Sequence, residues 1–158
     1  MSVDPDAYRA VLGRFASGVT VVTARDGQGR DHGMTVTAFS SVSLSPPLIM
    51  VCISHDASLR PVIDHCQHFA VSILSSSQEA LSRRFAAVGN RFEGIGFARG
   101  ELGGDALLDG ALACLECRIV ARHEAGDHTI VVGEVESAEN RDDRPLLYYR
   151  GGYAQLER

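Results

Sequence analysis

Short runs of apolar residues, most of them rich in β-branched side chains and bounded by turn residues, recur along the chain. Runs of about four to eight such residues are typical of β-strands. We therefore expect strands at Val19–Ala24, Leu48–Ile53, Phe69–Leu74, Leu115–His123 and Thr129–Glu136. Another is expected from Met34 to about Ser43, where alternation stops before Ser45-Pro46-Pro47, since proline cannot donate a hydrogen bond to a sheet.

The N-terminal segment has the spacing of a helix. Asp4 is suited to cap it, and Pro5 fits its first turn. The apolar positions that recur at helical spacing are Tyr8, Val11, Leu12 and Phe15. Ser17-Gly18 is expected to end this helix.

Two further helices are expected in the middle of the chain. Ser58 is placed to cap a short helix from Leu59 to His65, and residues 77–88 form another with a polar face. Residues 89–110 are rich in glycine and weakly patterned, so we expect a long functional loop there.

The order of these elements defines the fold class. Strands and helices do not alternate regularly, which argues against a doubly wound parallel sheet. Many short strands with a few short helices favour a mainly β protein, an antiparallel barrel with Greek-key connections. We find no repeat or linker, so residues 1–158 are expected to form a single domain. No GxGxxG or GxxxxGK[ST] motif is present, so any nucleotide is held by other means.

Composition and charge argue against two classes of function, nucleic-acid binding and membrane insertion. The chain has 158 residues, 45% of them apolar, and a formal net charge of -5 with acids and bases mixed. This balance argues against nucleic acid as the main partner, because phosphate backbones need a concentrated basic face. No apolar run approaches the roughly 20 residues of a membrane span, and the acidic N-terminus does not resemble a secretory signal. We expect a cytoplasmic protein without a membrane partner.

The four cysteines suggest neither a disulfide nor a metal centre. Cys114 and Cys117 have CxxC spacing but lie in a predicted strand, where residues three apart point to opposite faces. Cys66 lies near His65 and His68, yet a closed zinc site needs two convergent pairs of ligands. We therefore predict ordinary, partly buried cysteines and no metal site.

Hydroxyl groups alternate with apolar residues between Gly33 and Pro47. Thr35, Thr37, Ser41, Ser43 and Ser45 are predicted to share one face of the strand. Together with neighbouring Ser40, they are suited to present hydroxyl and backbone N–H groups to a phosphate or carbonyl. The alternative is a half-exposed strand whose solvent face is rich in serine and threonine.

Three other polar groups are candidates for binding. Residues 54–58 form a polar loop after a buried strand, although Ser58 alone is explained by helix capping. Arg83 and Arg84 beside Phe85 are suited to neutralise a phosphate and cover a planar ring; a solvated helix face is the alternative. His128 follows Gly126-Asp127 in a turn and is suited to hydrogen bonding or proton transfer, or is simply a polar surface residue.

Taken together, four segments resemble the flavin reductase domain family. They are SGVTVVTA (17–24), GMTVTAFSSVSLSPPLIMVCI (33–53), GDH (126–128) and YYRGGY (148–153). The resemblance extends from about Asp6 to Leu156. It implies a split β-barrel of the FMN-binding type, a homodimer, and a flavin in a groove near the subunit interface.

The resemblance also implies roles for individual residues. Thr35, Val36, Thr37 and Ala38 are expected along the isoalloxazine edge, with Ser40 and Ser41 beside the ribityl chain and phosphate. The same groove is expected to be lined by Cys52, Ser54 and Ser58. Arg83, Arg84 and Phe85 are expected to close on the flavin phosphate. His128 is expected near the nicotinamide nucleotide, as the candidate catalytic residue.

The expected reaction is hydride transfer from NADH or NADPH to FMN or FAD, with reduced flavin passing to a partner monooxygenase. Because the cofactors supply the chemistry, the absence of a strong acid–base pair in the sequence fits this expectation. The alternative is a flavin-binding module or sensor that holds its flavin tightly and has no independent turnover.

Overall fold

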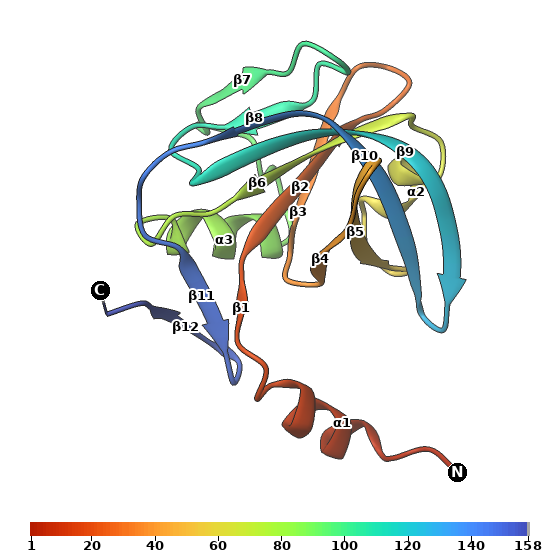
Figure 1. Cartoon of the computed structure of the whole chain (residues 1–158), viewed down its shortest axis with the longest axis vertical. Helices are drawn as coiled ribbons and strands as arrows, with labels where there is room; N and C mark the ends of the chain where they lie inside the picture. Colours follow the sequence, from red (N-terminus) through yellow and green to blue (C-terminus); the bar gives the residue numbers. More distant parts are fainter. Residues whose placement is uncertain (158) are drawn as a thin grey trace.

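The computed structural model describes residues 1–157, which form a mainly β structure with three short helices (Figure 1). A seven-stranded sheet has the order β3-β2-β6-β9-β10-β5-β4, with every neighbouring pair antiparallel. Its strands are β2 (Thr20–Arg25), β3 (Asp31–Val36), β4 (Phe39–Leu44), β5 (Pro47–Ser54), β6 (His68–Ile73), β9 (Ala113–Ala125) and β10 (His128–Asn140). The predicted β class and antiparallel pairing are confirmed.

Two small sheets complete the β structure. One contains β1 (Ser17–Gly18), β11 (Leu146–Tyr149) and β12 (Gly152–Gln155), in the order β1-β11-β12. The other is a hairpin of β7 (Phe97–Arg99) and β8 (Ala106–Leu108). This hairpin lies inside the segment expected to be one long loop, so that prediction was wrong. Its three-residue strands are too short to show a period in the sequence.

The predicted strand from Met34 to Ser43 is divided into two. β3 pairs with β2, whereas β4 pairs with β5, and the chain changes partner at Thr37 and Ala38. The backbone N–H of Phe39 donates to the Thr37 carbonyl (3.0 Å), which bends the chain there. A bulge between Ser41 and Ser43 adds a second irregularity. The continuous hydroxyl-bearing face predicted for this segment is therefore interrupted, because alternation cannot reveal a change of partner.

The first helix, α1 (Pro5–Leu12), is capped by Asp4 as predicted, with Oδ1 accepting from two backbone N–H groups. It ends at Leu12 rather than before Ser17, and none of its residues is buried. Figure 1 shows α1 projecting from the lower end of the molecule. Its apolar face therefore has no partner within residues 1–157.

The other two helices pack on the large sheet. α2 (Arg60–Ile63) begins after Leu59, which makes no side-chain capping bond, so the predicted Ser58 cap was wrong. Leu59 and Ile63 are fully buried in the main core with β-strand residues such as Phe69. α3 (Glu79–Ala86) covers a second core cluster through Phe85.

Candidate functional site

A small cavity lies where β3, α3 and the C-terminal strands meet. Its volume is about 190 Å³, and its lining includes Val19, Thr35, Thr37, Ser82, Tyr148 and Tyr153. Thr35 donates from Oγ1 to the Ser82 carbonyl (2.6 Å), and the Ser82 hydroxyl shares a 2.7 Å hydrogen bond with the Tyr153 hydroxyl. These bonds hold β3, α3 and β12 together around one polar surface.

The basic-aromatic segment of α3 has three different environments. The Arg83 guanidinium is exposed and lies 4.8 Å from the centre of the Tyr153 ring. Arg84 donates to backbone carbonyls of residues 90, 91 and 93, and so holds the loop after α3. Phe85 is fully buried and packs against Phe92. Of the three, Arg83 is therefore the exposed side chain that lies against Tyr153 of the cavity lining, and its Nε also pairs with Glu79 Oε2 (3.2 Å).

The bend between β3 and β4 connects this cavity to β5. Thr37 and Ala38 are exposed, whereas Val36 is buried in the core. The Ala38 carbonyl accepts from the backbone N–H of Cys52 (3.0 Å). Burial raises the pKa of the Cys52 thiol, so Cys52 is expected to line the surface as a neutral group.

The two serines of β4 lie next to this bend. Ser40 pairs with Met50 and Ser41 with Ile49 in the β4–β5 ladder. The Ser40 hydroxyl donates to the carbonyl of Ser41 (2.9 Å), so its proton is used locally. Ser40 is half-buried and Ser41 is exposed. Both hydroxyls remain able to accept a hydrogen bond.

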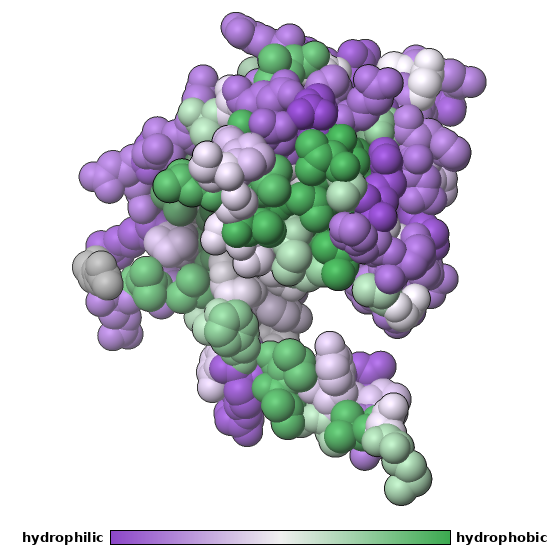
Figure 2. Space-filling model, turned by 45° about the vertical axis from the view of Figure 1, so that its right-hand side comes forward, coloured by the Kyte–Doolittle hydropathy of each residue, from purple (hydrophilic) through white to green (hydrophobic). Residues whose placement is uncertain are grey.

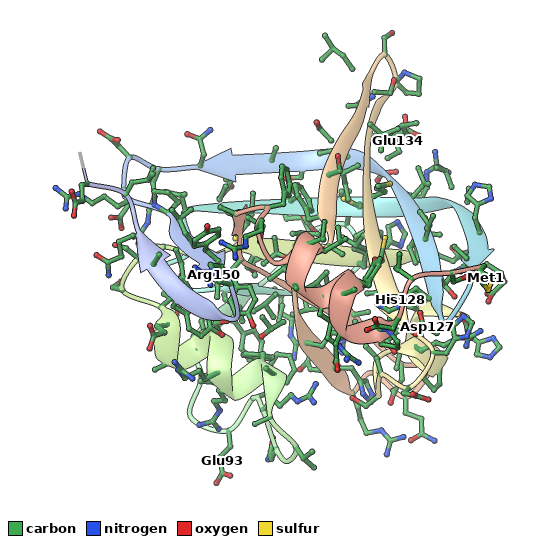
Figure 3. All side chains as sticks on the ribbon, turned by 90° about the horizontal axis from the view of Figure 1, so that it is seen from below. Met1, Glu93, Asp127, His128, Glu134 and Arg150 are labelled. Atoms are coloured by element: carbon green, nitrogen blue, oxygen red, sulfur yellow. The ribbon has the colours of Figure 1, made fainter. Side chains whose placement is uncertain are left out.

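The far end of β5 meets the turn that carries His128. Ser54 pairs with His128 in the β5–β10 ladder. Figure 3 shows His128 and Asp127 side by side near the tip of the β9–β10 hairpin. His128 Nδ1 lies 2.7 Å from Asp127 Oδ1, and the hydrogen bond from His128 lowers the pKa of Asp127. This contact orients the imidazole, whose side chain is 43% exposed.

A network around Glu124 fixes this turn against the loop after β5. Its carboxylate accepts from the Thr129 hydroxyl (3.0 Å) and lies 2.8 Å from His55 Nε2 and 3.5 Å from an Arg60 nitrogen. These contacts, with the Thr129 hydrogen bond first, lower the pKa of Glu124. In addition, the His55 backbone N–H donates to the Asp127 carbonyl (2.9 Å).

These contacts connect several of the predicted residues along one surface. It passes from Tyr153 and Ser82 through Thr35, the Thr37–Ala38 bend and Cys52 to Ser54 and His128. Ser58 lies apart from this chain of contacts, where it lines a larger cavity beside α2. Glu124 and Tyr153 were not among the predicted site residues, although Tyr153 lies in the YYRGGY segment that carries the family resemblance. His55 was predicted only as part of the polar loop at residues 54–58.

The cysteines lie as their strand spacing predicted. Cys117 is buried in the main core, whereas Cys114 on the other face of β9 lies 3.7 Å from the Ser72 hydroxyl. All four cysteines are free thiols. Within residues 1–157, no group of three or more His, Cys, Asp or Glu residues is arranged to hold a metal ion. No helix in the same range is long and apolar enough to cross a membrane.

Comparison with known proteins identifies the family. The model of the flavin reductase like domain matches residues 12–157. The chain belongs to the flavin reductase like domain family. It is 46% identical to the reductase component of 4-hydroxyphenylacetate 3-monooxygenase from Thermus thermophilus, over 96% of each chain. It is also 44% identical to an NADH-dependent flavin reductase from a Rhodococcus species, covering 98% of this chain and 88% of that protein.

A solved member of the flavin reductase like family has the same fold. The NADH:FAD oxidoreductase from Streptomyces globisporus, in complex with NAD and FAD fragments, superposes with a TM-score of 0.92 at 38% identity. The match covers 99% of this chain and 97% of that one. The family resemblance seen in the sequence is therefore confirmed.

Proposed function

We propose that this protein is an NADH:flavin oxidoreductase that supplies reduced flavin to a partner monooxygenase. The observation that carries the proposal is the connected polar surface from Tyr153 through the Thr37–Ala38 bend to His128. Relatives that cover most of the chain are named as an NADH-dependent flavin reductase and as a monooxygenase reductase component. When bound at this surface, FMN or FAD supplies the hydride acceptor.

The residues of this surface fit a flavin by their hydrogen-bonding groups. Thr37 and Ala38 lie outside both strands, and their backbone N–H groups donate no backbone hydrogen bond within residues 1–157. These N–H groups are suited to the polar edge of an isoalloxazine ring, where they stabilise negative charge. Ser40 and Ser41 offer acceptors for the ribityl hydroxyls, and Ser54 lies farther along the same surface. Arg83 supplies positive charge for a phosphate.

His128 is the residue we assign to the nicotinamide nucleotide. Its Nδ1 contacts Asp127, which leaves Nε2 to bind the nucleotide. Holding the nicotinamide against the flavin turns two separate solutes into an aligned pair, which contributes several kcal/mol to catalysis. His128→Ala is therefore expected to raise the KM for NADH more than it weakens flavin binding. His123→Ala is the control, because His123 is exposed on the neighbouring strand β9.

The decisive experiment measures the loss of NADH absorbance by the purified protein, with and without added FMN or FAD. The proposal is supported if NADH oxidation requires added flavin and its rate reaches a maximum as the flavin concentration is raised. Tightly bound flavin without oxidation of NADH or NADPH would refute it and favour the flavin-binding module.

A homodimer of split, Greek-key barrels is the assembly we propose. The apolar side chains of α1 include Val11 (68% exposed), and just beyond the helix Phe15 is 81% exposed. Figure 2 shows apolar residues on α1 and on the neighbouring face of the body. β3 and β4, the edges of the large sheet, are joined at the bend that carries the flavin surface. A second copy packed against α1 would cover apolar area next to that surface.

Two expectations from the sequence stay predictions. One is that the chain acts as a single flavin reductase domain. The other is that the enzyme works in the cytoplasm, where NADH and a monooxygenase partner are both available.

A further inference from the structure

The C-terminal hairpin contacts α3 through one tyrosine. Tyr153 on β12 pairs with Tyr148 on β11, and the centres of their rings lie 5.4 Å apart in an edge-to-face arrangement. The Tyr153 hydroxyl shares its 2.7 Å hydrogen bond with the Ser82 hydroxyl of α3. Figure 1 shows the hairpin beside this helix. Tyr153 therefore joins the end of the chain to the helix that carries Arg83.

The same tyrosine holds the Arg83 guanidinium in place. The guanidinium carbon lies 4.8 Å from the ring centre, within the distance of about 6 Å at which an aromatic face attracts a cation. Arg83 Nε also contacts Glu79 Oε2 (3.2 Å), one turn earlier in α3. The Arg83 side chain is 64% exposed, so without such contacts it would be distributed over many rotamers. The ring and the carboxylate together restrict it.

These contacts leave the two outer nitrogens of Arg83 available. Within residues 1–157, the only hydrogen bond or ion pair of this side chain is the one from Nε to Glu79. In contrast, Arg84 and Arg91 each donate from two nitrogens to backbone carbonyls. Two parallel N–H donors are the arrangement that binds a phosphate strongly. Arg83 is therefore the arginine of this segment best placed to bind an anion.

The cavity that Tyr153 and Ser82 line has the size of part of a ligand. Its volume of about 190 Å³ is smaller than the roughly 300 Å³ at which sites for whole small molecules begin. Most of its lining residues carry hydroxyl groups, and no carboxylate of the described residues is among them. Hydroxyl donors without a competing negative charge, next to a cation, suit a small anionic group.

We propose that Tyr153 is a positioning residue for the flavin phosphate, which it serves by holding Arg83 against the cavity. The proposal rests on the proposed function, in which FMN or FAD binds at this surface. Both flavins carry this phosphate, whereas riboflavin has the same ring and ribityl chain without it. The consequence is a preference for phosphorylated flavins that depends on the C-terminal hairpin as well as on α3.

Two substitutions separate the two contacts of Tyr153. Tyr153→Phe keeps the ring beside Arg83 and removes the hydrogen bond to Ser82, whereas Tyr153→Leu removes both. Tyr149→Leu is the control, because Tyr149 is 41% exposed on the neighbouring strand β11. Each substitution is also made together with Arg83→Ala.

The Kd values for FMN and for riboflavin are measured for each protein by the quenching of flavin fluorescence. The ratio of the two Kd values isolates the contribution of the phosphate. Tyr153→Leu is expected to reduce the preference for FMN about two- to fivefold, which corresponds to a cation–π contact of about 0.5–1 kcal/mol. Tyr153→Phe and Tyr149→Leu should retain the preference. With Arg83→Ala present, Tyr153→Leu should change the ratio no further, because the tyrosine acts through the arginine.

Melting temperatures of the same proteins distinguish positioning from a merely structural role. Ser82 is fully buried, and either substitution of Tyr153 removes the partner of its hydroxyl, so both variants should melt below wild type. Positioning predicts that Tyr153→Phe is less stable yet still prefers FMN. The proposal is overturned if both variants lose the preference equally, if Tyr153→Leu keeps it, or if Tyr153→Leu lowers it as much without Arg83.

The failure of this proposal can be told apart from the failure of the proposed function. A wild-type protein that oxidises NADH but binds FMN and riboflavin equally overturns the phosphate role and leaves the reductase function standing. A protein whose preference for FMN depends on Tyr153 but which oxidises neither NADH nor NADPH refutes the reductase function and leaves the positioning role standing.

Discussion

Replacement of Asp105 by asparagine is expected to stabilise the protein at neutral and alkaline pH. Asp105 is 4% exposed, and burial raises the pKa of its carboxyl to about 6. A hydrogen bond from the Arg25 backbone N–H opposes this shift, whereas the nearby Glu116 carboxylate adds to it. Asparagine keeps the size and the acceptor oxygen but carries no charge, so the variant avoids the cost of burying a carboxylate.

The size of the effect follows from the difference in pKa between the folded and unfolded states. The carboxyl of the unfolded chain titrates near about 3.9. Below pH 4 both states are protonated and the buried carboxyl costs nothing. Between pH 4 and 6 the folded state holds a proton that the unfolded state has released, so stability falls as pH rises. Above pH 6 the full cost applies, at most about 3 kcal/mol for about two pKa units.

The measurement is the melting temperature of both proteins between pH 4.5 and 8. For a chain of this length, 3 kcal/mol corresponds to an increase of about 6–12 °C. The advantage of Asp105→Asn should grow as pH rises through 6 and then level off. Asp142→Asn, at an exposed position, is the control. An advantage that is absent, or equal at pH 4.5 and pH 8, would refute the assigned cost of ionising Asp105.

Three other predictions address the core, the His128 turn and the proposed dimer. Gly133→Ala should lower the free energy of unfolding by about 1–3 kcal/mol in a denaturant titration, because a Cβ there would lie 2.8 Å from atoms of Phe69 and Cys117. Glu124→Gln should raise the KM for NADH with little change in kcat, since it weakens the contacts that hold the His128 turn; an unchanged KM would contradict this. Phe15→Ser should shift the protein towards monomer in sedimentation, whereas a wild-type monomer would exclude the dimer.

Local patterns determined much of the secondary structure. β-branched runs identified the core strands because a buried strand needs apolar residues that pack on a pleated surface. Asp4 identified the start of α1 because a cap is formed by groups two or three residues apart. The candidate residues from Thr35 to Ser54, together with His128, came from family motifs in the sequence, and the structure brings several of them into one surface.

Only the tertiary structure decided how these parts meet. The alternation from Met34 to Ser43 is the same whether a strand keeps one partner or, as here, changes from β2 to β5 at Ala38. In the sequence, the position of Phe85 beside two arginines predicts a ligand-binding aromatic residue. In the structure Phe85 is buried, because α3 packs on the sheet. The Glu124 network and the large cavity join residues far apart in the chain. Contacts of this kind depend on the path of the backbone, which no local pattern of residues contains.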